Sequence, residues 1–533
     1  MTLESGALAG YGWCVKEPGP GRLRLAELLA ALSLATDLGN GMPLERTMRT
    51  ALMSVEVGRH LGLPDRDVSS AFYLALLRAI GCTAFAHEEA QAYGDDIAYR
   101  WTYFPVDFGR AEEVVAATRA HLALGQPVEA RERAIARFFA DGPRLASEMA
   151  AAACSVAVRF ASRLGMNDAV SRGLTHIWER WDGKGFPQGL AEETIEISAR
   201  LVTLANVVEI DHRTAGRDVA CENVARRSGG WFDPEIARAF LDCAADVFGL
   251  IESESVWESL LDAEPSPRIT LPLSRLDDVT TAFADFVDLK SPYLVGHSSG
   301  VARLASGAAA IVGLDEEERV HLRHAGLLHD LGRVSVSNGI WDKPGPLGAA
   351  EWERVRLHPY YSERVVMQSP LLSSLGPLVG MHHERLDGSG YHRGASGSQL
   401  TRAARLLEAA DVFQALTEER PHRPARTPRD AVGVVQDEAE VGRLDRDAVR
   451  AVVETAGERA GRSRARWPAG LTEREVEVLR LLARGRSQRQ IANELVISPS
   501  TAHTHIVHIY EKCRVSTRAS VALFAMENDL IAV

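Results

Sequence analysis

A chain of 533 residues is longer than one hydrophobic core usually serves, so we expect about two to four domains. The net charge of -12 excludes a nucleic-acid-binding surface along the whole chain, but it allows a small DNA-reading module at one end. Aromatic residues make up only 6% of a chain rich in Ala, Leu, Arg and Val, which favours helices. Six scattered cysteines without a C-x-x-C pair predict buried thiols. The chain shows neither a signal-peptide pattern nor a run of about 18 apolar residues, which predicts a cytoplasmic protein without membrane spans.

The chain contains an internal repeat. Residues 327–332 (LLHDLG) resemble residues 76–81 (LLRAIG) at a separation of 251, whereas residues 384–391 (ERLDGSGY) resemble residues 179–186 (ERWDGKGF) at a separation of 205. The decrease in separation from 251 to 205 implies about 46 extra residues in the first copy, which we place near residues 82–131. We therefore expect two related helical modules, over residues 1–265 and 266–456.

The second module concentrates side chains that can hold metal ions. His329 and Asp330 adjoin in an apolar stretch that we expect to be a buried helix ending at Gly332. An imidazole can bind one metal while the neighbouring carboxylate bridges two. Mixed nitrogen and oxygen ligands suit Fe, Mn, Ni or Zn better than Ca, and two such metals can act together in a phosphoryl displacement. Further ligand types follow the same pattern: His297, His358, His382, His383 and Asp411.

These motifs resemble those of the HD-family phosphohydrolases. His329-Asp330 is similar to the HD signature, and His382-His383-Glu384 followed by DGSGY at residues 387–391 resembles the HD-GYP subfamily, whose members hydrolyse cyclic di-GMP. The resemblance implies two divalent metal ions held by His297, His329, Asp330, His358, His382, His383 and Asp411. It also implies substrate contacts from Gly388, Gly390, Tyr391, Arg420 and Arg423.

The chain departs from the family pattern at several positions. The lysine that usually follows the HD pair is Arg333, which can bind phosphate with two donors but is a poor proton donor. The family's Gly-Tyr-Pro ends in His392, so the loop loses a fixed φ angle. Tyr293 stands where some members carry a ligand for a third metal, and Gln414 replaces an aspartate. We expect Asp330 and Arg333 to be the catalytic residues, with Arg333 also contacting the substrate.

The first module lacks the metal ligands. At the two separations, the seven ligand positions carry Arg46, Arg78, Ala79, Ala153, Ile177, Trp178 and Asn206. The surrounding sequence persists, and residues 182–187 (DGKGFP) keep the proline that the second module lacks. This module is therefore either a pseudo-enzyme that senses a ligand or only a structural partner. Arg46 and Arg78 either bind an anion or form salt bridges.

The polar residues 457–470 predict a linker, and a third module follows over residues 471–533. Thr472 with Glu475 predicts a capping box at the start of its first helix, and Ser487 opens the second helix in the same way. Ser498 and Pro499 begin a third helix, which we expect to run to about Lys512. Three short helices with a tight connection between the last two describe a helix-turn-helix.

This segment resembles the LuxR-type DNA-binding domain over nearly all of its length. Thr472, Glu475, Ile491-Ala492 and Lys512 stand where that family has them. Contacts to phosphates fix the register of such a module on DNA, and the exposed face of the third helix reads base edges. The resemblance implies DNA-binding residues at Arg486, Arg489, Ser500, His503, Thr504, His508 and Lys512.

The sequence thus predicts an all-α chain of two tandem HD-type modules and a C-terminal helix-turn-helix. We expect a metal-dependent phosphohydrolase, acting on cyclic di-GMP or a related nucleotide phosphodiester, coupled to DNA binding and transcriptional regulation. We also expect a homodimer that binds double-stranded DNA. The alternative is a non-catalytic LuxR-type transcription factor whose HD modules sense a nucleotide or a metal. A third possibility is that the tandem modules serve only as a dimerisation scaffold.

Overall fold

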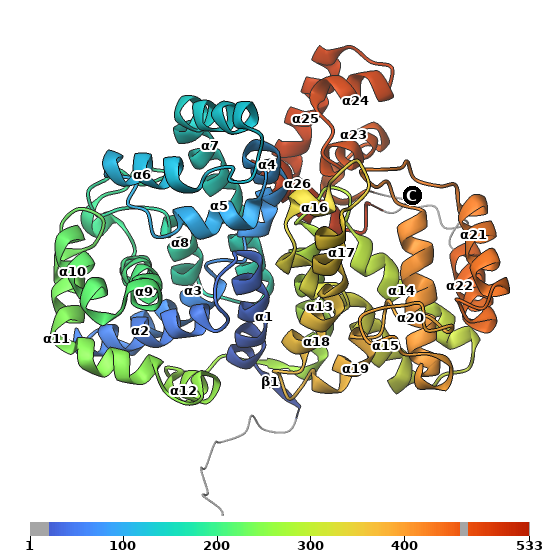
Figure 1. Cartoon of the computed structure of the whole chain (residues 1–533), viewed down its shortest axis with the longest axis horizontal. Helices are drawn as coiled ribbons and strands as arrows, with labels where there is room; N and C mark the ends of the chain where they lie inside the picture. Colours follow the sequence, from blue (N-terminus) through green and yellow to red (C-terminus); the bar gives the residue numbers. More distant parts are fainter. Residues whose placement is uncertain (1–20, 459–466, 532–533) are drawn as a thin grey trace, which may run out of the picture.

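The computed structural model describes residues 21–458 and 467–531. Over these residues the chain is mainly helical, and its two short strands, β1 (Arg22–Arg24) and β2 (Thr270–Pro272), pair antiparallel. The prediction of an all-α fold is therefore confirmed. Two helical halves lie side by side, and the C-terminal helices lie across the top of their junction (Figure 1). Most of the predicted linker, residues 459–466, lies outside the described residues.

The first half consists of helices and short 3-10 turns. Asp95 caps α5 by accepting hydrogen bonds from the next helical amides, and Asp233 with Pro234 opens α11. The helices are α1 (Leu25–Gly39), α2 (Arg46–His60), α3 (Asp65–Leu77), α4 (Ala86–Tyr93), α5 (Asp96–Tyr103), α6 (Ala111–His121), α7 (Val128–Arg163), α8 (Asp168–His176), α9 (Ile197–Ala215), α10 (Arg217–Arg227), α11 (Pro234–Ile251) and α12 (Val256–Ala263), with turns η1 (Cys82–Phe85) and η2 (Glu192–Thr194).

The second half follows from α13 to α22. Its elements are η3 (Leu273–Arg275), α13 (Leu276–Asp288), α14 (His297–Ile311), α15 (Glu316–Leu328), η4 (Leu331–Ser335), α16 (Asn338–Trp341), α17 (Ala349–Arg356), α18 (His358–Val366), η5 (Ser373–Leu375), α19 (Gly376–Val379), η6 (Gly397–Gln399), α20 (Arg402–Leu416), α21 (Pro428–Glu440) and α22 (Arg446–Glu458). We predicted that the helix of the HD pair ends at Gly332, but it ends at Leu328. The chain tightens there into the 3-10 turn η4.

The two halves repeat the same elements. Helices α14 and α15 begin and end 251 residues after α2 and α3, and α20 begins 205 residues after α9. A Cβ atom on Gly332 would lie 2.1 Å from the carbonyl oxygen of His358, and one on Gly81 would lie 2.1 Å from that of Ala153. The separation between equivalent residues of the two halves therefore falls from 251 to 205 between Gly81 and Ala153. This segment holds the helices α4, α5 and α6 and the first part of α7.

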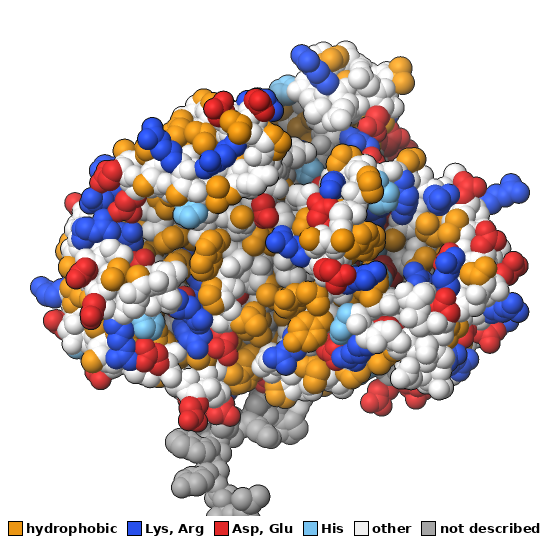
Figure 2. All heavy atoms as spheres, in the orientation of Figure 1, with side chains coloured by type: hydrophobic (Ala, Val, Ile, Leu, Met, Phe, Trp, Pro, Cys, Tyr) orange, Lys and Arg blue, Asp and Glu red, His pale blue; other side chains and the backbone are white. Residues whose placement is uncertain are grey.

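The halves pack against each other reciprocally. Helix α1 of the first half contacts η4 and α18 of the second, while α13 of the second half contacts η1 and α7 of the first. One hydrophobic core runs through both halves and into the C-terminal helices. Figure 2 shows charges of both signs interspersed over one face, with hydrophobic side chains gathered near the middle. The exchange of equivalent elements resembles the self-complementary interface of a twofold dimer.

Two helical segments are long and apolar enough to cross a membrane, Asp65–Tyr93 and Val128–Arg163. The most apolar window of the first is 94% buried inside the protein, as expected for a core segment. That of the second is 39% buried, and α7 contains Pro143. The later part of α7 packs against α8 and the C-terminal module. The expectation that the chain has no membrane span stays a prediction.

The C-terminal module begins with η8 (Pro468–Gly470) and contains α23 (Glu473–Ala483), α24 (Gln488–Glu494), α25 (Pro499–Cys513) and α26 (Arg518–Glu527). The capping boxes of Thr472 and Ser487 are both present, and Ser498 caps α25 as predicted. The fourth helix, α26, was not predicted. It packs on α23 and on α7 of the first half, and thereby attaches the module to the rest of the chain.

Candidate functional site

The seven predicted metal ligands come together inside the second half. They are carried by the start of α14, the end of α15, the start of α18, the turn after α19 and the middle of α20. These helices pack in one core, so residues far apart in sequence meet. His383 is the most exposed of them, with 20% of its side chain accessible. The seven are His297, His329, Asp330, His358, His382, His383 and Asp411.

Asp330 lies between two pairs of histidines. Its Oδ2 atom lies 3.6 Å from His297 Nε2 and 3.5 Å from His329 Nε2. Its Oδ1 atom lies 3.3 Å from His358 Nε2 and 3.6 Å from His382 Nε2. Each carboxylate oxygen therefore faces a different pair, which is the arrangement expected of a bridging ligand.

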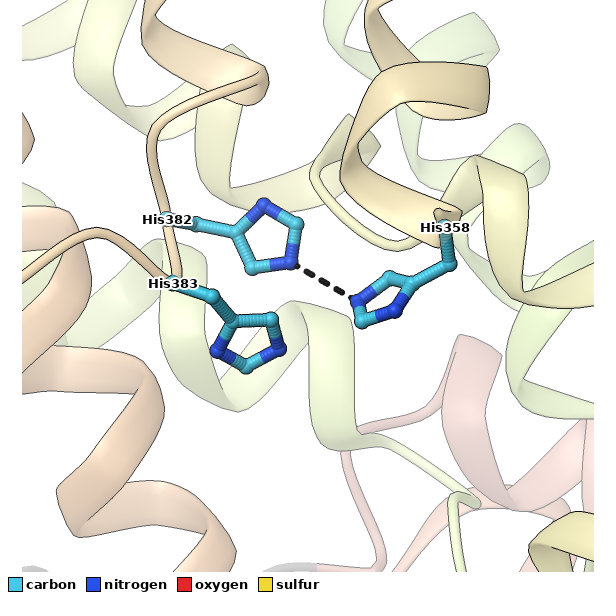
Figure 3. Close-up of side chains that lie close together, drawn as sticks. All are labelled: His358, His382 and His383. Carbon is cyan, nitrogen blue, oxygen red and sulfur yellow. Dashed lines mark hydrogen bonds between the residues drawn. The ribbon is translucent and has the colours of Figure 1, made fainter. Parts of the chain in front are cut away.

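Asp411 also faces histidines of both groups, His297 and His329 in one and His383 in the other. Its Oδ1 atom lies 3.2 Å from His297 Nε2 and 3.9 Å from His329 Nε2. Its Oδ2 atom lies 3.6 Å from His383 Nδ1. Figure 3 shows that the ring of His383 lies beside those of His358 and His382. The site therefore offers a set of three imidazoles next to a set of two imidazoles and a carboxylate.

The hydrogen bonds of the histidines leave nitrogen lone pairs pointing inward. His329, His358 and His382 each donate Nδ1–H to the carbonyl oxygen three residues earlier, at 2.6 to 2.7 Å. His358 Nε2 and His382 Nε2 then face each other at 3.1 Å (Figure 3). His329 Nε2 and Asp330 Oδ1 are buried and have no hydrogen-bond partner among the described residues. Converging acceptors without donors fit bound cations.

Burial and nearby charges hold His329 and Asp330 in the protonation states that metals need. At His297 burial alone would lower the pKa, but the charge of Glu418 and the hydrogen bonds to Asp411 and Glu418 outweigh burial and raise the pKa to about 10. Burial lowers the pKa of His329 to about 4. Burial alone would raise the pKa of Asp330, but the guanidinium of Arg333 and the neighbouring imidazoles outweigh it and hold that pKa well below its usual range. Neutral imidazoles and ionised carboxylates are the forms that coordinate metals.

Sequence reasoning missed Glu418. Its Oε2 atom accepts a hydrogen bond from His297 Nδ1 at 2.8 Å and another from Arg420 Nη2 at 2.8 Å. Gln414, which replaces the family's aspartate, donates to Glu418 Oε1 at 2.7 Å. Glu418 therefore orients His297 from behind. Glu418 lies just past the end of α20, so helical spacing from Asp411 gave no signal for it.

Arg333 is held at the edge of the site. Its Nη1 atom lies 3.3 Å from Asp330 Oδ2, and its guanidinium carbon lies 3.7 Å from the centre of the Trp341 ring. Trp341 in turn donates its indole N–H to the Arg333 carbonyl oxygen at 3.1 Å. Sequence reasoning did not identify Trp341. The stacked guanidinium is fixed in place with part of its edge exposed.

The loop of residues 387–391 passes close to the histidines. The backbone N–H of Tyr391 donates to the His383 carbonyl oxygen at 3.0 Å, and the two rings have centres 4.8 Å apart. Gly388 has φ 80°, and a Cβ atom on Gly390 would lie 2.5 Å from Glu384 Cα, so both positions require glycine. The loop therefore presents Tyr391 to the site.

The carboxylate of Glu384 holds this loop in place. It accepts hydrogen bonds from the backbone amides of Arg393 and Ala395, just after the loop, at 2.7 and 2.8 Å. Glu179 of the first half accepts equivalent bonds from the amides of Gln188 and Leu190 at 2.8 and 3.0 Å. The equivalent loop residues are thus held in the same way in both halves, although His392 replaces the proline of the first half.

Arg420 and Arg423 have different surroundings. Arg420 Nη2 lies 3.5 Å from His297 Nδ1, at the edge of the cluster. The Nη atoms of Arg423 donate to carbonyl oxygens of residues 415, 416, 418 and 424, and so hold the loop that carries Arg420 and Glu418. The structure thus brings Arg420 beside the cluster and gives Arg423 a supporting position.

The predicted DNA-binding residues divide into two sets. Arg486 pairs with Glu419 of the second half at 2.6 Å, and Lys512 pairs with Glu475 at 2.7 Å. Arg518 also pairs across modules, with Glu88 at 3.1 Å. The remaining predicted contacts lie exposed on α25 and at the start of α24: Arg489, Ser500, His503, Thr504 and His508.

Comparisons with known proteins agree with this geometry. The HD domain family model matches residues 281–448, and that of the bacterial regulatory proteins of the luxR family matches residues 469–525. The 3'3'-cGAMP-specific phosphodiesterase 3 of Vibrio cholerae is 30% identical over 421 residues, which cover 78% of this chain and 90% of that protein. The chain belongs to the HD-domain phosphodiesterase family. It is a metal-dependent phosphohydrolase that carries a LuxR-type DNA-binding domain.

Other HD-domain relatives match parts of the chain. A cyclic di-GMP phosphodiesterase of Pseudomonas aeruginosa is 32% identical over 179 residues, which cover 33% of this chain and 43% of that protein. A crystal structure of a cyclic GMP-AMP-specific phosphodiesterase of V. cholerae has a TM-score of 0.57 at 24% identity, over 82% of this chain and 98% of that chain. This likeness establishes the fold over both halves.

Proposed function

We propose that the second half of this chain hydrolyses a phosphodiester bond of a cyclic dinucleotide, either cyclic di-GMP or 3'3'-cGAMP. The observation that carries the proposal is Asp330, whose two carboxylate oxygens face separate pairs of histidines. We propose that the seven converging residues hold two divalent ions of Fe, Mn, Ni or Zn. The activities of the V. cholerae and P. aeruginosa relatives support a cyclic dinucleotide as the substrate.

The chain's own residues position the substrate and balance its charge. When bound, the metals supply Lewis acidity to the phosphoryl group and to the attacking water. Arg333, fixed against Trp341, offers parallel N–H donors to a phosphate oxygen and keeps its proton throughout. Arg420 adds positive charge beside His297. Tyr391 provides a ring face at the entrance for a nucleobase, next to His383.

The direct test is to incubate metal-loaded protein with cyclic di-GMP and with 3'3'-cGAMP and to separate the products by chromatography. We expect a linear dinucleotide or mononucleotides from at least one of them. If metal-loaded protein binds either nucleotide without forming product, the site is a sensor, and the non-catalytic transcription factor becomes the correct description.

Replacing Glu418 with glutamine is expected to weaken metal binding about 10- to 100-fold, the usual effect of losing a carboxylate behind a metal-binding histidine. The structural reason is the hydrogen bond from His297 Nδ1, which the carboxylate strengthens. Competition with a chromogenic chelator measures the affinity. Glu419→Gln is the matched control. It removes the same charge from the neighbouring residue, whose side chain faces Arg486 rather than His297. Equal losses in both variants would contradict this role for Glu418.

We also propose how the catalytic module and DNA binding are connected. Arg486 and Arg518, both suited to phosphate contacts, pair with Glu419 and Glu88 of the two halves. Glu419 directly follows Glu418, which orients His297. A change in the loop of Glu418 and Glu419 would therefore also change the docking of the DNA-binding module. Such a chain would act in the cytoplasm as a homodimer on double-stranded DNA.

Glu419→Gln is expected to raise DNA affinity about two- to fivefold, because an exposed ion pair contributes roughly 0.2–1 kcal/mol. Arg486 then loses its contact with the second half and keeps only its ion pair with Glu494 of its own module. Fluorescence anisotropy with a DNA duplex carrying the operator, first selected from random sequence, measures the dissociation constant. Asp437→Asn, at an exposed position of α21, serves as the control here and should leave DNA affinity unchanged. An unchanged or weaker DNA affinity in Glu419→Gln would show that this contact does not restrain the module.

A further inference from the structure

The first half contains a cavity where the second half has its histidine cluster. Its empty space, counted together with its opening to solvent, is about 980 Å³. Arg78, Trp178 and Asn206 line it, and they occupy the positions of His329, His383 and Asp411 in the repeat. The cavity is therefore the remodelled counterpart of the metal site.

Eight aromatic residues line the cavity. Helix α5 supplies Tyr99 and Tyr103, and the residues that flank α4 and α5 supply Phe85, Phe104 and Phe108. Helices α5, α6 and α7 belong to the upper part of the first half (Figure 1). Rings of this kind stack well on planar bases. The cavity-lining aromatic residues are Phe85, Tyr99, Tyr103, Phe104, Phe108, Trp178, Phe186 and Trp231.

Arg78 is the cavity's unpaired charge. The other charged lining residues are neutralised, since Arg100 pairs with Glu89 at 2.5 Å and Arg180 pairs with Asp107 at 2.5 Å. Arg78 is 7% exposed, forms no ion pair with any described residue, and its Nη1 atom has no hydrogen-bond partner among them. Burial, with the nearby charge of Arg46, lowers its pKa to about 9, so the guanidinium remains charged at neutral pH.

Arg46 differs from Arg78 in its contacts. It is fully buried, donates to Asn206 Oδ1, and has its Nε atom 4.0 Å from Glu209 Oε2. Its Nη1 atom nevertheless lacks a partner among the described residues. Arg46 is thus partly satisfied by the protein, whereas Arg78 points its charge into an aromatic cavity without compensation. A buried charge without a partner is costly to folding, and an anionic ligand would compensate it.

We infer that this cavity binds a nucleotide, with a phosphate group at Arg78 and the base against the aromatic wall. Guanidinium groups bind phosphate with two parallel hydrogen bonds, and the rings provide the stacking surface that a base requires. The first half is then a ligand-binding module rather than only a structural partner. The inference does not depend on hydrolysis in the second half, because none of its residues belongs to that site.

The test uses the full-length protein stripped of metal by a chelator, with GMP, AMP and cyclic di-GMP as probes. Trp178 and Trp231 line the cavity, so their fluorescence should change on binding, and calorimetry supplies the dissociation constant. We expect Arg78→Met to weaken binding about tenfold or more, as expected for losing charged hydrogen bonds to phosphate. We also expect this variant to melt at a higher temperature than the wild type when no ligand is present, because it removes the uncompensated charge.

Two further variants make the result decisive. Arg137→Met removes an exposed arginine of α7 and should bind and melt like the wild type. Trp178→Leu removes a stacking ring and should weaken binding without removing the charge, which tests the cavity even if Arg78→Met fails to fold. The inference is overturned if none of the three probes binds the wild type, or if Arg78→Met or Trp178→Leu binds as tightly as the wild type.

Discussion

Asp330→Asn is expected to reduce hydrolysis of the cyclic dinucleotide about a thousandfold or more, with loss of bound metal. The two oxygens of this carboxylate face separate histidine pairs, at 3.3 to 3.6 Å from four imidazole nitrogens. An amide of the same shape carries no charge and presents only one acceptor oxygen. Losing several kcal/mol of metal-dependent transition-state stabilisation corresponds to at least three orders of magnitude in rate.

Turnover by chromatography and metal content by plasma mass spectrometry check this prediction together. Asp437→Asn is the matched control, because Asp437 is an exposed residue of α21 away from the cluster. It should retain both activity and metal. If Asp330→Asn kept more than a tenth of the wild-type turnover, Asp330 could not be the residue that joins the two groups. If the variant lost turnover but kept all its metal, Asp330 would have a role in the reaction rather than in metal binding.

Much of this architecture could be predicted because the signals are local or repeated. Capping residues such as Thr472 and Ser487 act on amides three positions away, so their spacing alone defines where helices begin. The repeat predicted two related helical modules, and equivalent helices recur at the same two separations. The change of separation also bounded the segment that contains the extra helices of the first half.

Other features depend on contacts between distant segments. Asp96 of α5 accepts hydrogen bonds from Lys290 Nζ, Ser337 Oγ and the Asn338 amide, each at 2.8 Å, and thereby joins the extra helices to the second half. Nothing next to Asp96 in the sequence indicates these partners. The stacking of Trp341 on Arg333 likewise depends on the path of η4 and α16. The end of α15 was misplaced by four residues because η4 is fixed by contact with α18, not by its own sequence.

Gly332→Ala is expected to lower the free energy of unfolding by about 3 kcal/mol, the upper end of overpacking effects, and to weaken metal binding as well. Its new Cβ atom would lie 2.1 Å from the carbonyl oxygen of His358 and 2.6 Å from the amide nitrogen of Ser362. Both contacts are backbone, so no side-chain rotation relieves them. Moving η4 away from α18 would separate Asp330 from His358.

The repeat supplies a control that separates these two effects. In Gly81→Ala the new Cβ atom would meet the Ala153 carbonyl oxygen at the same 2.1 Å, but no histidine cluster lies there. This variant should lose similar stability and keep its metal. Gly433→Ala, on an exposed helix position with open space around it, should gain roughly 0.5–1 kcal/mol instead. Denaturant unfolding together with metal analysis measures all three variants. If Gly81→Ala lost metal to the same extent as Gly332→Ala, the metal loss would reflect general destabilisation, and the close contact of η4 with α18 would have no specific role in holding the site.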